Sequence, residues 1–336
     1  MRRRVRSEFT APLWLIKSWK AVLIISGGIT LVILLITVKN IYLKWNSVNW
    51  FGHEPYRILV LNVDSPKEPV KITLVNAIPD TGNNIFVDIP TQTMLSSVGG
   101  LGNYRVGAFY QLGEIEGLGN RLLKDSVGFT LGIPIHQVLE IPENTSTVPW
   151  GKVRRQVIEE GLRGKRSLPE AIKVWQLLSK AGNDSGIRLS ITEENALRTK
   201  PDVDGRMNYY LEQALLDRFV MDNLLTVWKE AALLQVAVIN ASGKSQMATQ
   251  WSRLARVGGF DVVNVSDQQI QSETTTLLFQ NKDLLGLESA KSLMRLYPKA
   301  KVAVGDTSNY RCQAAIILGM DSWKWLNERN EYTQKN

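Results

Sequence analysis

The longest apolar stretch lies near the beginning of the chain, where residues 21–38 (AVLIISGGITLVILLITV) contain no charged side chain. The apolar character continues to Leu43, interrupted only by Lys39 and Asn40. A helix of about 20 apolar residues can cross the hydrocarbon core of a bilayer. A cleavable signal peptide would have a shorter apolar region and a small-residue cleavage site, which this segment lacks. We therefore predict a transmembrane helix over residues 21–43.

The charges beside this predicted helix indicate its orientation. Residues 1–20 carry six basic side chains against one acid, Glu8, whereas only Lys39 and Lys44 closely follow the span. Cytoplasmic flanks of membrane spans are enriched in Lys and Arg. We expect residues 1–20 to form a cytoplasmic tail and the bulk of the chain to be extracytoplasmic, held at the cell membrane by a single pass.

Short apolar runs separated by turn residues follow the span. Residues 57–63, 70–75 and 84–89 have the length and composition of strands, with a turn at residues 79–82. Residues 118–128 have apolar side chains at the spacing of an amphipathic helix. The part from 148 to 234 is predicted to be mostly helical. One helix is expected over 168–178, with Ser167 as its N-cap and Pro169 in its first turn, and a second, longer helix over 209–234. Residues 57–234 are therefore expected to form a mixed α/β domain.

A second, smaller α/β domain is expected over residues 235–321. Its pattern is a strand at 236–240, a helix at 245–257 and a strand at 260–265, followed by a strand at 275–279, a helix at 287–296 and strands at 301–304 and 314–318. Such a domain of nearly 90 residues is large enough to fold alone. Residues 322–336 are expected to form a polar tail that is frayed after Trp325.

Composition excludes several classes of function. The formal net charge of +8 divides into +5 for residues 1–20, +2 for Lys39 and Lys44, and +1 for the rest. It gives no evidence for a nucleic-acid-binding face. One cysteine, Cys312, and two histidines, His53 and His136, cannot form a disulfide or a Cys/His zinc site. We predict no cofactor and no metal.

Two glycine motifs resemble nucleotide-binding loops but lack required residues. A phosphate-binding loop ending in Gly243, Lys244 and Ser245 would need a glycine at the position of Val238. We expect a strand-to-helix turn there instead. Gly100 and Gly102 are followed by Arg105 where a dinucleotide-binding motif has its third glycine.

The C-terminal segment VAVINASGKSQMATQWSRLARVGGFDVV, together with AAIILGMD, resembles the LytR C-terminal domain of bacterial envelope proteins. Residues 57–234 resemble, more weakly, the catalytic domain of the LytR-CpsA-Psr (LCP) family through ILVLNVDS, KITLVNAIPDTGNNIFVDIPTQT, GFTLGIPIHQVLEI and ITEENALRTKPDVDGRMNYYLEQALL. This resemblance implies phosphotransferases that move a glycopolymer from an undecaprenyl-pyrophosphate lipid to peptidoglycan. Their acids hold a divalent metal, and their arginines bind the pyrophosphate.

This chain departs from the family at positions that carry that chemistry. Val70 replaces an acid, Thr91 and Gln92 replace an arginine and an acid, and Tyr209 replaces a further arginine. The family pattern is retained at four residues that we treat as candidate phosphate- or lipid-binding residues: Asp64, Arg105, Arg198 and Arg206. An ordinary surface role for the arginines is the alternative.

The resulting interpretation is an extracytoplasmic binding or scaffold protein of cell-wall or surface-polymer assembly. Its expected partners are the membrane and either a polyprenyl-phosphate lipid or a peptidoglycan or glycopolymer strand. The alternative is a divergent phosphotransferase with a metal site formed by Asp64 and either Asp80 or Asp88. A regulator of wall genes is disfavoured, because a cytoplasmic tail of about 20 residues is too short for a DNA-binding domain.

Overall fold

The computed structural model describes residues 55–63, 69–78, 84–142, 149–163, 168–180, 186–201, 205, 207–224, 234–297 and 299–328. The predicted cytoplasmic tail and the predicted span over 21–43 lie outside these ranges. Within them, none of the helices has the length and apolar character that crossing a bilayer requires.

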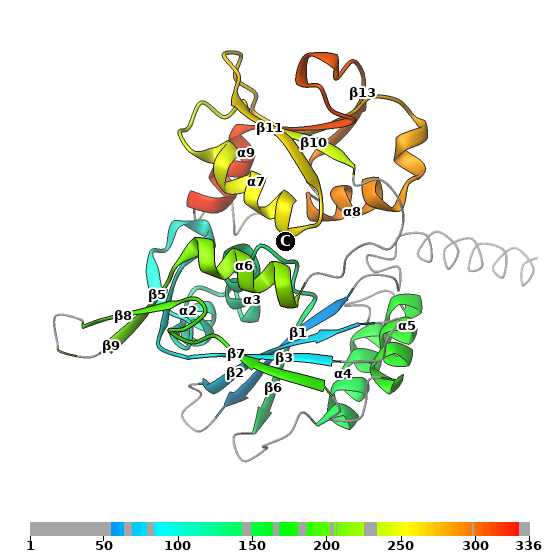
Figure 1. The fold of residues 1–336 in the computed structure, drawn as a ribbon. Helices are drawn as coiled ribbons and strands as arrows, with labels where there is room; N and C mark the ends of the chain where they lie inside the picture. Colours follow the sequence, from blue (N-terminus) through cyan, green and yellow to red (C-terminus); the bar gives the residue numbers. More distant parts are fainter. Residues whose placement is uncertain are drawn as a thin grey trace, which may run out of the picture.

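The first domain is built on a five-stranded sheet, sheet A (Figure 1). Its strands lie in the order β6 (Gln137–Pro142), β1 (Tyr56–Val63), β2 (Pro69–Ala77), β3 (Asn84–Ile89) and β7 (Gly186–Ser190). The strands predicted from the apolar runs at 57–63, 70–75 and 84–89 are confirmed as β1, β2 and β3. Nearly all of β1 is buried, because helices cover both faces of the sheet, which explains its continuous apolar sequence.

Two pairs of helices cover sheet A. One face packs against α2 (Ala108–Ile115) and α3 (Asn120–Leu131), and Leu59 of β1 belongs to this core. The other face packs against α4 (Trp150–Leu162) and α5 (Leu168–Lys180), and Ile58 and Val60 belong to that core. The helix predicted over 118–128 is α3, which continues to Leu131 and ends at Gly132 with a left-handed φ of 72°.

A second sheet, sheet B, has the order β5 (Asn103–Arg105), β4 (Thr93–Ser96), β9 (Met207–Leu211) and β8 (Leu197–Pro201). The helix predicted over 209–234 is wrong at its beginning, because Tyr209 and Tyr210 lie in β9. Their backbone pairs with β4 on one side and β8 on the other. The helix that follows, α6, covers only Gln213–Asn223.

The C-terminal domain is built on a third sheet, sheet C, in which β10 and β14 lie side by side. Its order is β11 (Asp261–Asp267), β10 (Gln235–Asn240), β14 (Ala314–Leu318), β12 (Thr276–Phe279) and β13 (Lys301–Val304). Helices α7 (Met247–Val257) and α8 (Glu288–Leu296) pack on one face over a core that contains Trp251, Phe279 and Leu293. The predicted order of strands and helices in this domain is confirmed.

The loop at Gly243–Ser245 is the predicted strand-to-helix turn. The side chain of Asn240, at the end of β10, donates to the carbonyl oxygen of Lys244 at 2.8 Å and accepts from the hydroxyl of Ser242 at 2.6 Å. The Lys244 ammonium lies over the ring of Trp323, 4.6 Å from its centre. These contacts fix the loop and engage the lysine.

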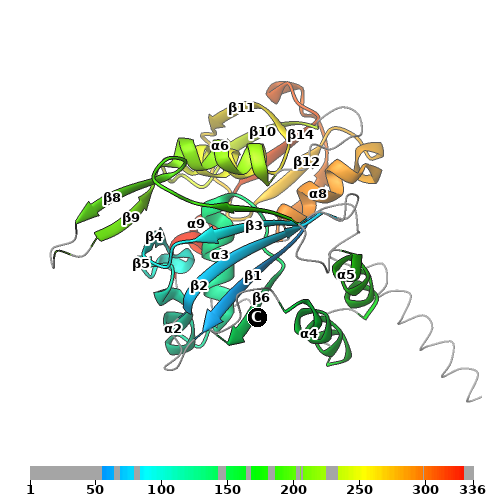
Figure 2. The ribbon, with the colours of Figure 1, turned by 60° about the horizontal axis from the view of Figure 1, so that its bottom comes forward.

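A helix, α9 (Met320–Asn327), occupies the first residues of the predicted polar tail. The expected fraying after Trp325 is wrong for Leu326 and Asn327, because α9 continues to Asn327 and Leu326 packs against the first core. Trp325 contacts the cores of both domains. Gly100 lies so close to the carbonyl oxygen of Asn327 that an added Cβ would be only 2.0 Å from it. The two domains are therefore in direct contact through α9 (Figure 2).

Candidate anion-binding site

One row of paired residues crosses sheet B and carries an arginine at each end. Arg105 pairs with Met94, Met94 with Tyr210, and Tyr210 with Arg198. Directly paired residues project from the same face of a sheet, and each strand step is about 4.8 Å. Arg105 and Arg198, which are 93 positions apart in the sequence, therefore project from one face with their backbones about 14 Å apart.

Further polar side chains project from the same face. Asn208 and Lys200 lie two residues from Tyr210 and Arg198 and pair with each other. The Nε atom of Arg105 donates to the Asn208 side-chain oxygen at 2.8 Å. The Lys200 ammonium is 5.5 Å from the centre of the Tyr210 ring. We call the face formed by Met94, Arg105, Arg198, Lys200, Asn208 and Tyr210 the basic face.

Among the described residues, few acidic side chains neutralise the positive charge of this face. Arg105 is oriented by a neutral amide, and neither it nor Lys200 forms an ion pair with a described residue. Arg198 donates to Glu212 at 2.6 Å, but the two side chains are 56% and 41% exposed. An exposed pair of this kind contributes only about 0–1 kcal/mol. A phosphate group can displace Glu212 at little cost, and the face is suited to binding an anion.

The structure brings together two of the four candidate residues. Arg105 and Arg198 share the basic face, whereas Asp64 and Arg206 lie outside the described residues. Tyr209, which stands where the family has another arginine, packs against the first core on the opposite face of sheet B. An arginine at 209 would therefore not join this face without a change in the strand.

Asp88, one of the acids considered for a metal site, is engaged by other side chains. It accepts a hydrogen bond from the Thr73 hydroxyl at 2.6 Å and forms ion pairs with Lys71 at 3.0 Å and Arg188 at 3.5 Å. A metal ion at this carboxylate would have to displace two cations. Among the described residues, no group of three or more His, Cys, Asp or Glu side chains comes together as a metal site would require.

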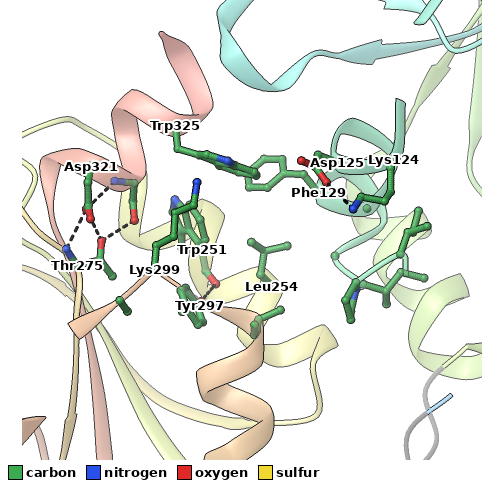
Figure 3. Close-up of a pocket in the computed structure, with 18 of the residues that line it drawn as sticks. Lys124, Asp125, Phe129, Trp251, Leu254, Thr275, Tyr297, Lys299, Asp321 and Trp325 are labelled. Atoms are coloured by element: carbon green, nitrogen blue, oxygen red, sulfur yellow. Dashed lines mark hydrogen bonds and ion pairs between the residues drawn. The ribbon is translucent and has the colours of Figure 1, made fainter. Parts of the chain in front are cut away.

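An interdomain cavity of about 360 Å³ lies between α3 and the C-terminal domain (Figure 3). Its walls include four aromatic side chains: Phe129, Trp251, Tyr297 and Trp325. Trp251 is central, with ring-centre distances of 5.3 Å to Tyr297 and 5.9 Å to Phe129. Burial raises the pKa of Tyr297, whose hydroxyl donates to the Trp251 carbonyl oxygen at 3.3 Å.

Two of the acidic side chains that line this cavity already have hydrogen-bond or ion-pair partners within the protein. Asp321 accepts hydrogen bonds from the backbone and hydroxyl of Thr275, and Asp125 is paired with Arg121. The buried indole N–H of Trp251 forms no hydrogen bond with any described residue. The cavity therefore presents mainly apolar surface and is suited to an apolar group rather than to acid–base chemistry.

Sequence reasoning missed Lys200, Asn208 and Tyr210 on the basic face. The signal that would have found them is the period of two along residues 197–211, which puts Arg198, Lys200, Asn208 and Tyr210 on one face once the segment is assigned to a hairpin. The helix predicted from 209 onward concealed this period. The pairing of β4 with β9, which joins the two arginines, has no local signature.

Comparison with known families identifies the C-terminal domain. Residues 233–321 match the family model LytR_C, described as "LytR cell envelope-related transcriptional attenuator". These residues therefore form a LytR C-terminal domain, and the resemblance inferred from the sequence is confirmed. The matched range includes all of sheet C but ends inside α9. No curated protein matches the chain.

Several solved structures are similar to the chain at low identity. TagT from B. subtilis is 15% identical, with a TM-score of 0.34, and the match covers 50% of this chain and 89% of TagT. TagV from B. subtilis is 11% identical, with a TM-score of 0.35, and the match covers 50% and 95%. A structure described as the LytR-CPS2A-psr family protein YwtF (TagT) with bound octaprenyl pyrophosphate lipid is 15% identical, with a TM-score of 0.34, and the match covers 50% and 88%.

Proposed function

We propose that this chain is a membrane-anchored, extracytoplasmic binding component of cell-wall or surface-polymer assembly. Its ligand is an anionic, phosphate-bearing molecule, either a polyprenyl-phosphate lipid or a glycopolymer. The observation that carries the proposal is the basic face, where Arg105, Arg198 and Lys200 project together from sheet B. The presence of a LytR C-terminal domain supports the assignment to the cell envelope. The anchor is the predicted span over residues 21–43.

The basic face favours binding over transfer. Guanidinium groups recognise phosphate through paired, charge-assisted hydrogen bonds. Transfer of a phosphoryl group would also need a metal or another group to stabilise the developing charge. Asp88, the one acid of the candidate metal site that lies among the described residues, is already paired with Lys71 and Arg188. The divergent phosphotransferase is the second candidate, and it requires that Asp64 or Asp80 complete a site.

The test measures binding and turnover on the same preparation. The full chain in detergent or lipid nanodiscs is incubated with a polyprenyl pyrophosphate, with and without Mg²⁺. We expect saturable binding that does not need Mg²⁺, and no release of phosphate. Because each charge-assisted hydrogen bond contributes about 1.5–3 kcal/mol, R105A and R198A should each weaken binding roughly tenfold or more.

The matched control is R256A, which removes an exposed arginine from α7 in the other domain. It should bind as tightly as the unmodified chain, and all variants should show similar melting temperatures. Binding that is unaffected by R105A and R198A would overturn the assignment of the basic face. Mg²⁺-dependent turnover that these variants abolish would establish the phosphotransferase instead.

A further inference from the structure

Helix α5 has two apolar faces, and only one of them is packed against the protein. Ala171, Val174 and Leu178 are fully buried in the core beneath sheet A. On another side of the helix Leu168, Ile172 and Trp175 remain 44%, 42% and 42% exposed. At about 100° per residue, these three side chains lie within an arc of about 60°. They form one continuous stripe, which we call the outer stripe.

The end of α4 extends this apolar surface. Leu162, at the last position of α4, is 72% exposed. The preceding residue, Gly161, is in contact range of Leu168, since an added Cβ would lie 3.5 Å from the Leu168 side chain. Single exposed apolar residues are common on protein surfaces, whereas contiguous exposed apolar patches mark sites of interaction with a protein or a membrane. The outer stripe is therefore a surface that a partner would cover.

Positive charge is concentrated in the stretch of sequence that contains α4 and α5. Residues 150–180 contain eight Lys or Arg side chains and three Glu. This net charge of +5 exceeds the +1 of residues 45–336 as a whole, so the remainder of the extracytoplasmic part is net acidic. On the described helices, Lys152, Arg155 and Lys180 are exposed, and Lys173 is partly exposed. Glu159 pairs with Arg155 and Arg163 but cannot neutralise the group.

The chain also holds these two helices close to the predicted span. β1 begins at Tyr56, which belongs to the same core as the buried faces of α4 and α5. Figures 1 and 2 both show the beginning of β1 beside α5. The predicted span ends at Leu43, and twelve residues can extend at most about 42 Å. The beginning of β1 and the neighbouring helix α5 are therefore within reach of the bilayer.

We infer that the outer stripe, together with the exposed Lys and Arg side chains of α4 and α5, binds these two helices to the anionic membrane surface. The membrane is the one that the predicted helix over residues 21–43 spans. The inference rests on that predicted span and is independent of the basic face. Apolar side chains of such helices enter the boundary between headgroups and acyl chains by roughly 5–10 Å, while Lys and Arg remain at the phosphates. Tryptophan is well suited to this boundary.

This contact would orient the whole extracytoplasmic part. The C-terminal domain packs against α3 and α6, on the opposite side of sheet A from α4 and α5. With the outer stripe on the lipid, the LytR C-terminal domain faces away from the membrane. The protein would then present this domain toward the wall while the first domain lies on the lipid surface.

The test uses the full chain, reconstituted in nanodiscs that contain phosphatidylglycerol. Cys312, the single cysteine, is replaced by C312A, and an environment-sensitive fluorophore is attached at I172C. We expect its emission to shift to shorter wavelength and to be quenched by lipids that carry a nitroxide group. The matched control is I270C, which labels a 75% exposed isoleucine in the C-terminal domain and should remain accessible only to aqueous quencher.

Two further measurements separate the apolar and electrostatic parts of the contact. Replacing phosphatidylglycerol by phosphatidylcholine, or raising the salt concentration, should reduce the lipid quenching at position 172. The variant W175S should reduce it severalfold, with an unchanged melting temperature because Trp175 lies outside the core. Equal lipid quenching at 172 and 270 would overturn the inference. So would failure of the chain to enter nanodiscs, or protection of 172 from aqueous quencher without lipid quenching, which would indicate a protein partner.

Discussion

Tyr110 and Glu140 form a polar contact at the edge of the first core. The Tyr110 hydroxyl donates to Glu140 at 2.9 Å, and the other carboxylate oxygen of Glu140 accepts from Asn120 at 2.7 Å. Burial, the hydrogen bond to Glu140 and the nearby negative charge together raise the pKa of Tyr110 to about 12. The contact joins α2 to β6 only while the phenol keeps its proton.

The pH dependence of stability should report this contact. The pKa of Tyr110 is higher in the folded than in the unfolded chain, so its contribution to the free energy of unfolding is complete below about pH 10. It is lost as the pH rises to about 12. Y110F should lower the free energy of unfolding by about 0.5–1.5 kcal/mol at pH 7. The difference in melting temperature between the two chains should shrink above pH 10, and a difference that stays constant from pH 8 to 12 would contradict the assigned pKa.

At the scale of elements, burial decides which parts of the fold could be predicted. β1, β2 and β10 are buried on both faces, so their apolar runs are visible without any knowledge of their partners. β9 is different, because its strand conformation depends on pairing with β4 and β8. Arg105 and Arg198 could be selected through the family resemblance alone. Their common position on sheet B follows from that pairing and could not be derived from either segment.

Helix α9 shows the same dependence on tertiary contacts and gives an element-scale prediction. Its first turn is fixed by Asp321 and Ser322, which hydrogen bond with Thr275, and its later residues Trp323 and Trp325 pack against the second core. A chain that stops after residue 321 loses both indole rings. Since burying a large apolar side chain contributes about 1.5–3 kcal/mol, this chain should melt at least several degrees lower.

The control for this truncation is a chain that stops after residue 328 and keeps α9 complete. Its melting temperature should equal that of the unmodified chain. Thermal unfolding followed by circular dichroism compares the three chains. Equal melting of the chains ending at 321 and at 328 would show that α9 does not stabilise the C-terminal domain.

At the scale of the whole molecule, the two domains share side chains. Val257 of α7 belongs to the first core, and Phe129 of α3 packs against the second. The interface also has a polar link, because Arg253 of α7 donates to Asp217 of α6 at 2.7 Å. The same guanidinium donates to the carbonyl oxygen of Thr130 near the end of α3, where helical carbonyl groups lack internal partners. Residues 235–321 are predicted to fold alone, but in the whole chain these contacts couple their unfolding to that of the first domain.

Arg253 offers the sharpest test of how strongly the domains are coupled. Its side chain is only 16% exposed, and R253A would leave Asp217 and the end of α3 without this donor. Losing hydrogen bonds of this kind lowers the free energy of unfolding by about 1–3 kcal/mol. Because the cost falls on the interface rather than on either core, we expect calorimetry to resolve two transitions in R253A where the unmodified chain shows one. R256A removes the exposed arginine three residues further along α7, keeps the Arg253 contacts and should retain the single transition. A single, unshifted transition in R253A would mean that the apolar contacts of Phe129, Val257 and Trp325 suffice to join the domains. Two transitions in the unmodified chain would mean that the C-terminal domain already unfolds independently.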